Sequence, residues 1–127
     1  MNSKDINIKL AEINIEDFIW MIYLLIIIMS YYSNHLERNY YLTNNIISKD
    51  KYRKVLITIF SILIVVYVYF LKNSVDDLNN LRPGDSEKKK RLVTLSFLAS
   101  LFISISGFIY LYIAVVDDDL NVELAFN

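Results

Sequence analysis

The chain of 127 residues carries 13 basic and 14 acidic side chains, and 55% of its residues are hydrophobic. Its net charge of −1 gives no reason to expect a nucleic-acid partner, and its lack of cysteine excludes disulfides and thiolate metal sites. The single His35 excludes a multi-histidine site within one chain, and the length allows one domain at most.

The hydrophobic residues are gathered into three runs that contain no Asp, Glu, Lys or Arg. These runs span residues 18–36, 55–71 and 92–116. A bilayer core of roughly 30 Å requires about 20 helical residues, and all three runs are close to that length. A soluble domain would instead alternate apolar and polar positions along each element. The pattern predicts an all-α integral membrane protein, with residues 1–127 forming one three-span membrane domain.

The N-terminal residues 1–17 form an amphipathic lead-in to the first run, with Ile6, Leu10 and Ile13 near helical spacing. This segment is acidic next to the apolar run, and no small-x-small cleavage pattern follows the run. We therefore interpret the first apolar run as a permanent anchor rather than a signal peptide. The first helix is expected to leave the lipid near Tyr32 and to continue as far as Asn44-Asn45.

The second helix is expected to begin near Lys51 and to end at Arg82. Its Ile, Val and aromatic content would favour a strand in water, but three segments in lipid cannot close a barrel, so a helix is required. Pro83 stops this helix and Gly84 reverses the chain. The second and third helices are therefore predicted to form an antiparallel hairpin with a Pro-Gly turn.

The third helix is expected to begin near Ser86 and to run to Val116. Its uncharged run exceeds the thickness of the bilayer core, which predicts a tilt or an immersed end. Small residues follow one ridge of this helix, at Ser96, Ser100, Ser104 and Gly107. Helices in lipid associate by close backbone approach and hydrogen bonds, so this ridge is predicted to be a packing seam against the other helices or a second copy. The alternative is that its hydroxyls line a hydrated path.

A polar cluster follows the first apolar run, at Asn34, Glu37 and Arg38. We interpret it as an interfacial group of caps and salt bridges, and the alternative is that Asn34 and Glu37 hold a cation. The tail 117–127 is acidic and is either disordered or a short docked segment. Three consecutive carboxylates at a helix end point about 100° apart, so Asp117–Asp119 are not expected to converge on a metal ion.

The basic residues indicate the orientation of the chain. The N-terminal tail and the loop between the second and third helices together carry more Lys and Arg than the first loop and the C-terminal tail. This favours a cytoplasmic N-terminus and an external C-terminus in a multi-pass protein of the cell membrane. The composition is also typical of an AT-rich bacterial genome.

Motifs of enzymes, nucleotide sites and channel filters are absent from the sequence. The sequence therefore predicts a non-catalytic accessory or interaction subunit, or an immunity-type regulator, without cofactor or metal. Its expected partners are the bilayer and either a membrane protein or a second copy of the chain bound through the third helix. The alternative is a self-assembling pore or small transporter, similar to holins in size and span count, with a serine-lined path.

Overall fold

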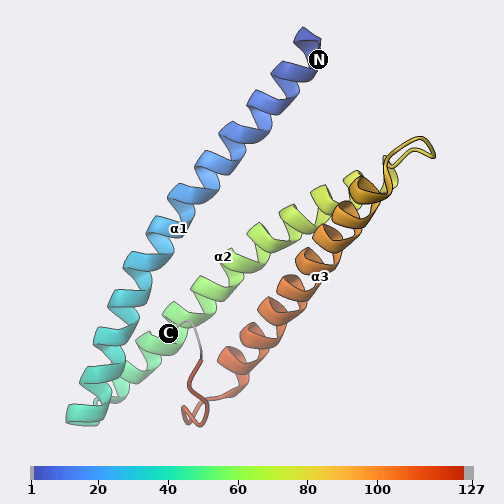
Figure 1. Cartoon of the computed structure of the whole chain (residues 1–127). Coiled ribbons are helices and arrows are strands. Elements are labelled where there is room, and N and C mark those ends of the chain that lie inside the picture. The colour runs from blue at the N-terminus through green and yellow to red at the C-terminus, as the bar shows by residue number, and fades with distance from the viewer. Residues whose placement is uncertain (1, 125–127) are drawn as a thin grey trace.

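The computed structural model describes residues 2–124, and this part of the chain contains three helices. They are α1 (Ser3–Thr43), α2 (Ile46–Asn79) and α3 (Glu87–Val116) (Figure 1). Each is long and apolar enough to cross a membrane, which confirms the predicted all-helical chain with three apolar helices. At 1.5 Å per residue their lengths are roughly 60, 50 and 45 Å, so each exceeds a core of roughly 30 Å and must tilt or protrude.

Helix α1 is continuous through the predicted lead-in. The Asn2 side chain accepts a hydrogen bond from the Asp5 N–H at 2.9 Å and so caps the first turn. The helix ends where expected, because Asn44 adopts the left-handed conformation with φ 52°. Its N–H still reaches the Tyr40 carbonyl oxygen at 2.7 Å. Asparagine tolerates this conformation better than most residues, which explains the stop.

Both predicted ends of the second helix were wrong. Helix α2 begins about one turn before Lys51, because the Asn45 side chain accepts hydrogen bonds from the N–H groups of Ile47 and Ser48. It ends at Asn79 rather than Arg82. The Arg82 N–H donates to the Asp85 carboxylate at 2.7 Å, so this part of the chain belongs to the following turn.

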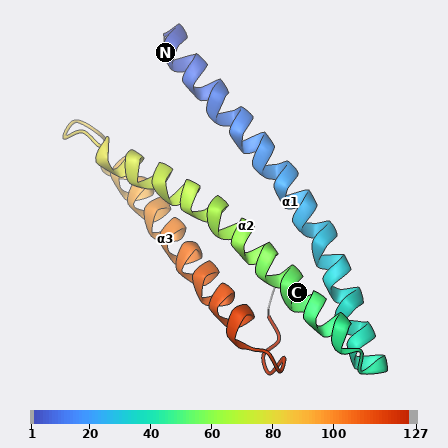
Figure 2. The ribbon, with the colours of Figure 1, turned by 180° about the vertical axis from the view of Figure 1, so that it is seen from behind.

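Helix α2 is the central one of the three helices. Helix α2 packs against both neighbours, whereas no backbone positions of α1 and α3 among residues 2–124 lie within 8 Å of one another. Both views show α1 meeting α2 near Asn44 and diverging from it toward the N-terminus (Figures 1 and 2). Helix α2 accordingly supplies more of the buried apolar side chains than either neighbour, namely Tyr52, Leu56, Ile59, Phe60, Leu63 and Val66.

Helices α2 and α3 lie side by side (Figure 2). The Asp85 N–H donates to the Arg82 carbonyl oxygen at 3.0 Å across the Pro83-Gly84 dipeptide. The Ser86 hydroxyl then accepts from the Lys89 N–H at 3.1 Å and caps α3, which begins at Glu87. Gly84 does not have a positive φ, so its role in the turn does not depend on the conformations that only glycine adopts readily.

The apolar runs of α2 and α3 are out of register. Ser100 contacts Ser74, which lies beyond the end of the run 55–71. The first part of the run 92–116 therefore lies beside the polar end of α2. One consequence is that apolar side chains of α3, including Leu92 and Leu95, extend past the depth at which α2 becomes polar.

Candidate functional site

Most of the small-residue ridge of α3 contacts α2. The hydroxyl oxygens of Ser100 and Ser74 lie 2.8 Å apart, and the Ser104 hydroxyl donates to the carbonyl oxygens of Ser100 and Tyr67 at 2.8 and 3.3 Å. Gly107 is buried, and a Cβ atom at this position would lie 3.0 Å from the Tyr67 ring. The absence of a side chain at Gly107 thus allows the Tyr67 ring to pack directly on the α3 backbone.

Ser96 lies on the same ridge but is exposed. It lines a polar groove at the end of the molecule that holds the α2–α3 loop. The ridge is therefore divided: three of its residues contact α2, and the fourth faces the groove.

Two polar contacts between helices involve residues that the sequence patterns did not single out. Ser74 is the α2 partner of Ser100, and the Asn39 side chain donates to the Ser48 hydroxyl at 2.7 Å between α1 and α2. Ser48 and Ser74 are both more than nine-tenths buried. The small size of serine was the sequence signal for these contacts between helices. Both serines lie in polar segments, however, where a serine does not by itself indicate a buried contact.

The structure separates the residues of the predicted polar cluster. Asn34 and Arg38 are exposed on α1. Glu37 is half-buried, accepts a hydrogen bond from Tyr52 of α2, and shares a cavity of about 280 Å³ with Glu123. The surroundings of Glu37 are therefore a tyrosine and a second carboxylate.

Residues 117–124 form a docked segment, which we call the C-terminal clasp; residues 125–127 of the predicted tail lie outside the described residues. The Asp117 carboxylate accepts hydrogen bonds from the N–H groups of Asn121 and Val122, both at 2.9 Å. These bonds favour the charged form and lower the pKa of Asp117 below its ordinary value of 3.8. The tight turn places Leu120 in the left-handed conformation with φ 54°.

Leu124 and the ion pair between Lys49 and Asp119 hold the clasp against α2, and Arg53 of α2 binds the last turn of α3 beside it. Leu124 is 4% exposed and lies with Tyr52 and Leu56 in the hydrophobic core. The Arg53 guanidinium donates to the Val115 carbonyl oxygen at 3.1 Å, and Lys49 lies 3.8 Å from Asp119. The acidic tail thus meets basic residues near the start of α2.

The opposite end of the molecule contains a polar groove with a volume of about 550 Å³. All three helices line it: Lys9, Glu12 and Glu16 from α1, Phe70, Asn73, Ser74, Asp76, Asp77 and Asn80 from α2, and Ser96 and Ser100 from α3. Lys9 is the one cationic residue of this lining and lies 3.5 Å from Glu12. Carboxylates therefore outnumber cations in this acidic groove.

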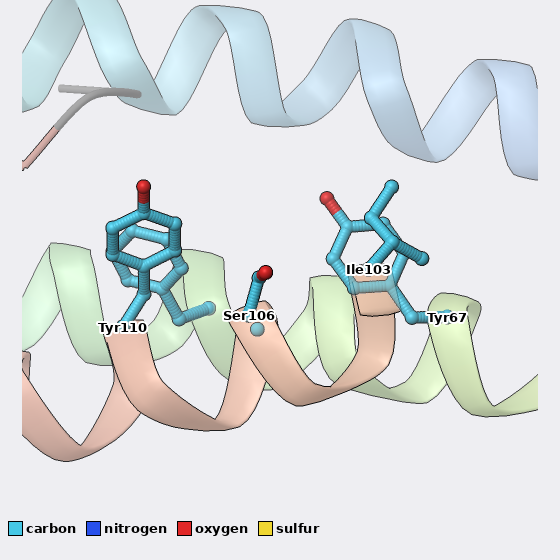
Figure 3. A pocket seen from close by; sticks show the side chains of 6 residues that line it. Tyr67, Ile103, Ser106 and Tyr110 are labelled. Atoms are coloured by element: carbon cyan, nitrogen blue, oxygen red, sulfur yellow. The ribbon is translucent and has the colours of Figure 1, made fainter. Parts of the chain in front are cut away.

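An aromatic pocket of about 180 Å³ lies next to the groove, between α2 and α3. Its lining residues are Phe60, Tyr67, Ile103, Ser106, Gly107 and Tyr110. The rings of Phe60 and Tyr110 stack with centroids 5.5 Å apart. Figure 3 shows the hydroxyl oxygens of Tyr67 and Tyr110 turned toward the side on which α1 lies. The pocket is thus apolar at its base and carries two phenol groups at its mouth.

Among residues 2–124, no group of three or more His, Asp or Glu side chains is arranged to hold a metal ion. Comparison of the chain with protein-family models, with curated proteins and with solved structures gives no match.

Proposed function

We propose that this chain is a small non-catalytic integral membrane protein that acts as an accessory or interaction subunit, or as a regulator, of a membrane-protein partner. It crosses the cell membrane with spans near 18–36, 55–71 and 92–116. In the bilayer, α2 and α3 act as an antiparallel hairpin that turns at Pro83-Gly84.

The uneven burial of the three helices carries this proposal. Helix α2 is covered on two sides, whereas α1 and α3 bury few residues each. Phe102, Phe108 and Tyr112 of α3 are all more than half exposed. The outer faces of α1 and α3 are therefore free to pack against another membrane protein. Packing between helices is the main source of association in lipid, so these faces are suited to an interaction subunit.

The small-residue ridge supports a partner-binding function over a pore. The hydroxyls of Ser100 and Ser104 are engaged between α2 and α3. A lumen lined by these groups would require the hairpin to open. The self-assembling pore is therefore kept as an outcome of the experiment below.

Photo-cross-linking in native membranes tests the proposal. Benzoylphenylalanine replaces Phe102 or Phe108 on the exposed side of α3, and the buried Phe60 serves as the control position. We expect one protein adduct of defined mass from the exposed positions and none from Phe60. Adducts at multiples of the chain mass, together with conductance in planar bilayers, would instead identify a pore. Adducts with lipid alone would contradict both functions.

The proposed orientation places the N-terminus in the cytoplasm and the C-terminal tail outside. The first loop and the C-terminal clasp lie at one end of the molecule, and the N-terminus and the second loop lie at the other (Figure 1). A reporter enzyme that is active only outside the cell is fused after Gly84 or after Asn127, which lies outside the described residues. We expect activity from the second fusion alone, and the opposite pattern reverses the orientation.

A further inference from the structure

The aromatic pocket and the acidic groove follow one another along the same faces of α2 and α3. Tyr67 and Ile103 line the pocket, and Phe70 and Ser100 line the groove. On each helix the two residues are three positions apart, about 4.5 Å along the axis. Pocket and groove therefore lie next to one another on the same faces of the two helices, and we call the two together the cleft.

The cleft changes from apolar to charged where the membrane changes from hydrocarbon to headgroups. The pocket residues lie within the uncharged runs 55–71 and 92–116. The groove residues of α1 precede the run 18–36, and those of α2 lie at or beyond the end of the run 55–71. Ser96 and Ser100 of α3 lie within the run 92–116, so the charged residues of the groove come from α1 and α2. A molecule that fills the whole cleft must therefore be amphiphilic, with its polar part at the loop end.

The pocket suits a hydrocarbon chain in its size and its chemistry. It has a volume of about 180 Å³, and its lining is mostly aromatic and apolar. Burial of apolar surface against apolar groups is favourable, so a segment of a hydrocarbon chain is a suitable occupant.

The charge of the groove distinguishes among headgroups. Glu12, Glu16, Asp76 and Asp77 supply four carboxylates, which can only accept hydrogen bonds, against the single ammonium group of Lys9. A primary ammonium group donates three hydrogen bonds and is attracted by this excess of negative charge, whereas an anionic headgroup is repelled. The ammonium group of Lys9 is the one cation of the groove lining that can pair with the phosphate of a zwitterionic headgroup.

We propose that the cleft binds one phospholipid with a primary ammonium headgroup, of the phosphatidylethanolamine class. One hydrocarbon chain lies over Tyr67, Gly107 and Tyr110, and the headgroup lies among the carboxylates and amides of the acidic groove. The occupant is a lipid of the surrounding bilayer, so the site needs no partner protein.

Native mass spectrometry of the delipidated full chain in mild detergent measures this binding directly. Phosphatidylethanolamine and phosphatidylglycerol with identical acyl chains are titrated separately. We expect one phosphatidylethanolamine per chain, bound up to about fivefold more tightly than phosphatidylglycerol, because a partly solvated ion pair contributes up to about 1 kcal/mol. Equal affinity for the two lipids, or a dimer without bound lipid, would overturn the proposal.

Two sets of variants separate the pocket from the groove. Ser106→Phe fills the pocket, and Ser61→Phe introduces the same ring at an exposed position of α2 outside the cleft. We expect Ser106→Phe to lose binding of both lipids and Ser61→Phe to retain it. Equal binding by these two variants, with unchanged helical circular dichroism, counts against the pocket as the chain site.

The double variant Asp76→Asn/Asp77→Asn removes two carboxylates from the groove without changing the size of the side chains. Its matched control is Asp50→Asn/Asp118→Asn, because both of these residues are exposed and lie outside the groove. We expect only the groove variant to lose the preference for phosphatidylethanolamine while still binding lipid. A preference that survives in this variant assigns the headgroup to another place and refutes the proposed site.

Discussion

At the end where α1 meets α2, which we call the closed end, the helices contact through the Asn39–Ser48 hydrogen bond, and the C-terminal clasp covers α2. At the other, open end, α1 stands away from the α2–α3 hairpin and the acidic groove lies between them (Figure 1). The side chains at the two ends explain this difference. Closing the open end would bring the carboxylates of Glu12 and Glu16 against those of Asp76 and Asp77 and remove them from water. Burying unpaired like charges is costly, so the helices remain apart.

The largest expected effect comes from filling the seam that holds α3 to α2. In Gly107→Leu, the new Cβ atom would lie 3.0 Å from the Tyr67 ring, so the leucine side chain pushes α3 away from α2. We expect a loss of about 2 kcal/mol in the free energy of unfolding, measured by SDS titration in mixed micelles. Gly84→Leu is the matched control, because no atom lies within 4 Å of a Cβ at Gly84. Equal stability of the two variants would show that Gly107 is not a close-packed position.

The next effect tests how the closed end is covered. Leu124→Ala removes the apolar anchor of the clasp, and we expect the docked state of residues 117–124 to lose about 2 kcal/mol. Val122→Ala is the control, because Val122 is 52% exposed. Hydrogen exchange at the Asn121 and Val122 amides reports the docking. Similar exchange rates in the two variants would mean that the Leu124 side chain does not hold the clasp.

A smaller effect is expected from the hydrogen bond between Ser74 and Ser100. Single and double alanine substitutions form a double-mutant cycle, and hydrogen bonds between membrane helices contribute about 0.6 kcal/mol on average. We expect a coupling energy of that size in the SDS titration. Ser61→Ala replaces a hydroxyl that bonds only to its own helix, at the Ile57 carbonyl oxygen, and should couple to neither residue. A zero coupling between Ser74 and Ser100 would contradict the contact.

The smallest effect concerns the response of the clasp to pH. The pKa of Asp117 is lowered in the folded chain, so its charged carboxylate favours the docked turn at any pH above its ordinary value of 3.8. This contribution is lost as the pH falls through the lower folded pKa. We expect the Asn121 and Val122 amide resonances to shift together in that acidic range. In Asp117→Asn the shift should be absent, and its persistence would assign the titration to another group.

Much of the fold follows from side-chain chemistry that acts along the chain. The uncharged runs predict the three helices, and Asn44 and Ser86 mark where two of them stop or start. The start of α2 was predicted near Lys51, whereas the capping oxygen of Asn45 sets it several residues earlier. A capping hydrogen bond of this kind can be predicted from the sequence, but other local signals can indicate a different helix boundary.

The clasp and the acidic groove could not be predicted in the same way. The tail sequence has no period, and the burial of Leu124 depends on the position of α2 relative to the end of α3. The groove requires Glu16, Asp76 and Ser96 to come together from three helices, and each of them alone is an ordinary solvated residue. The regular spacing of small residues predicted the ridge of α3. Its partner Ser74 could not be predicted, because no pattern in the polar end of α2 marks this serine as a buried contact.

The central position of α2 also has a consequence for biogenesis. Among residues 2–124, the helix backbones that lie within 8 Å of one another belong to helices that are neighbours in sequence, as in repeat proteins whose units touch only the adjacent unit. During synthesis, α2 can pack on α1 as soon as it enters the bilayer, and α3 can then pack on α2. No helix has to wait for a distant partner, and the clasp forms last, once Leu124 has reached the surface already formed by Tyr52 and Leu56.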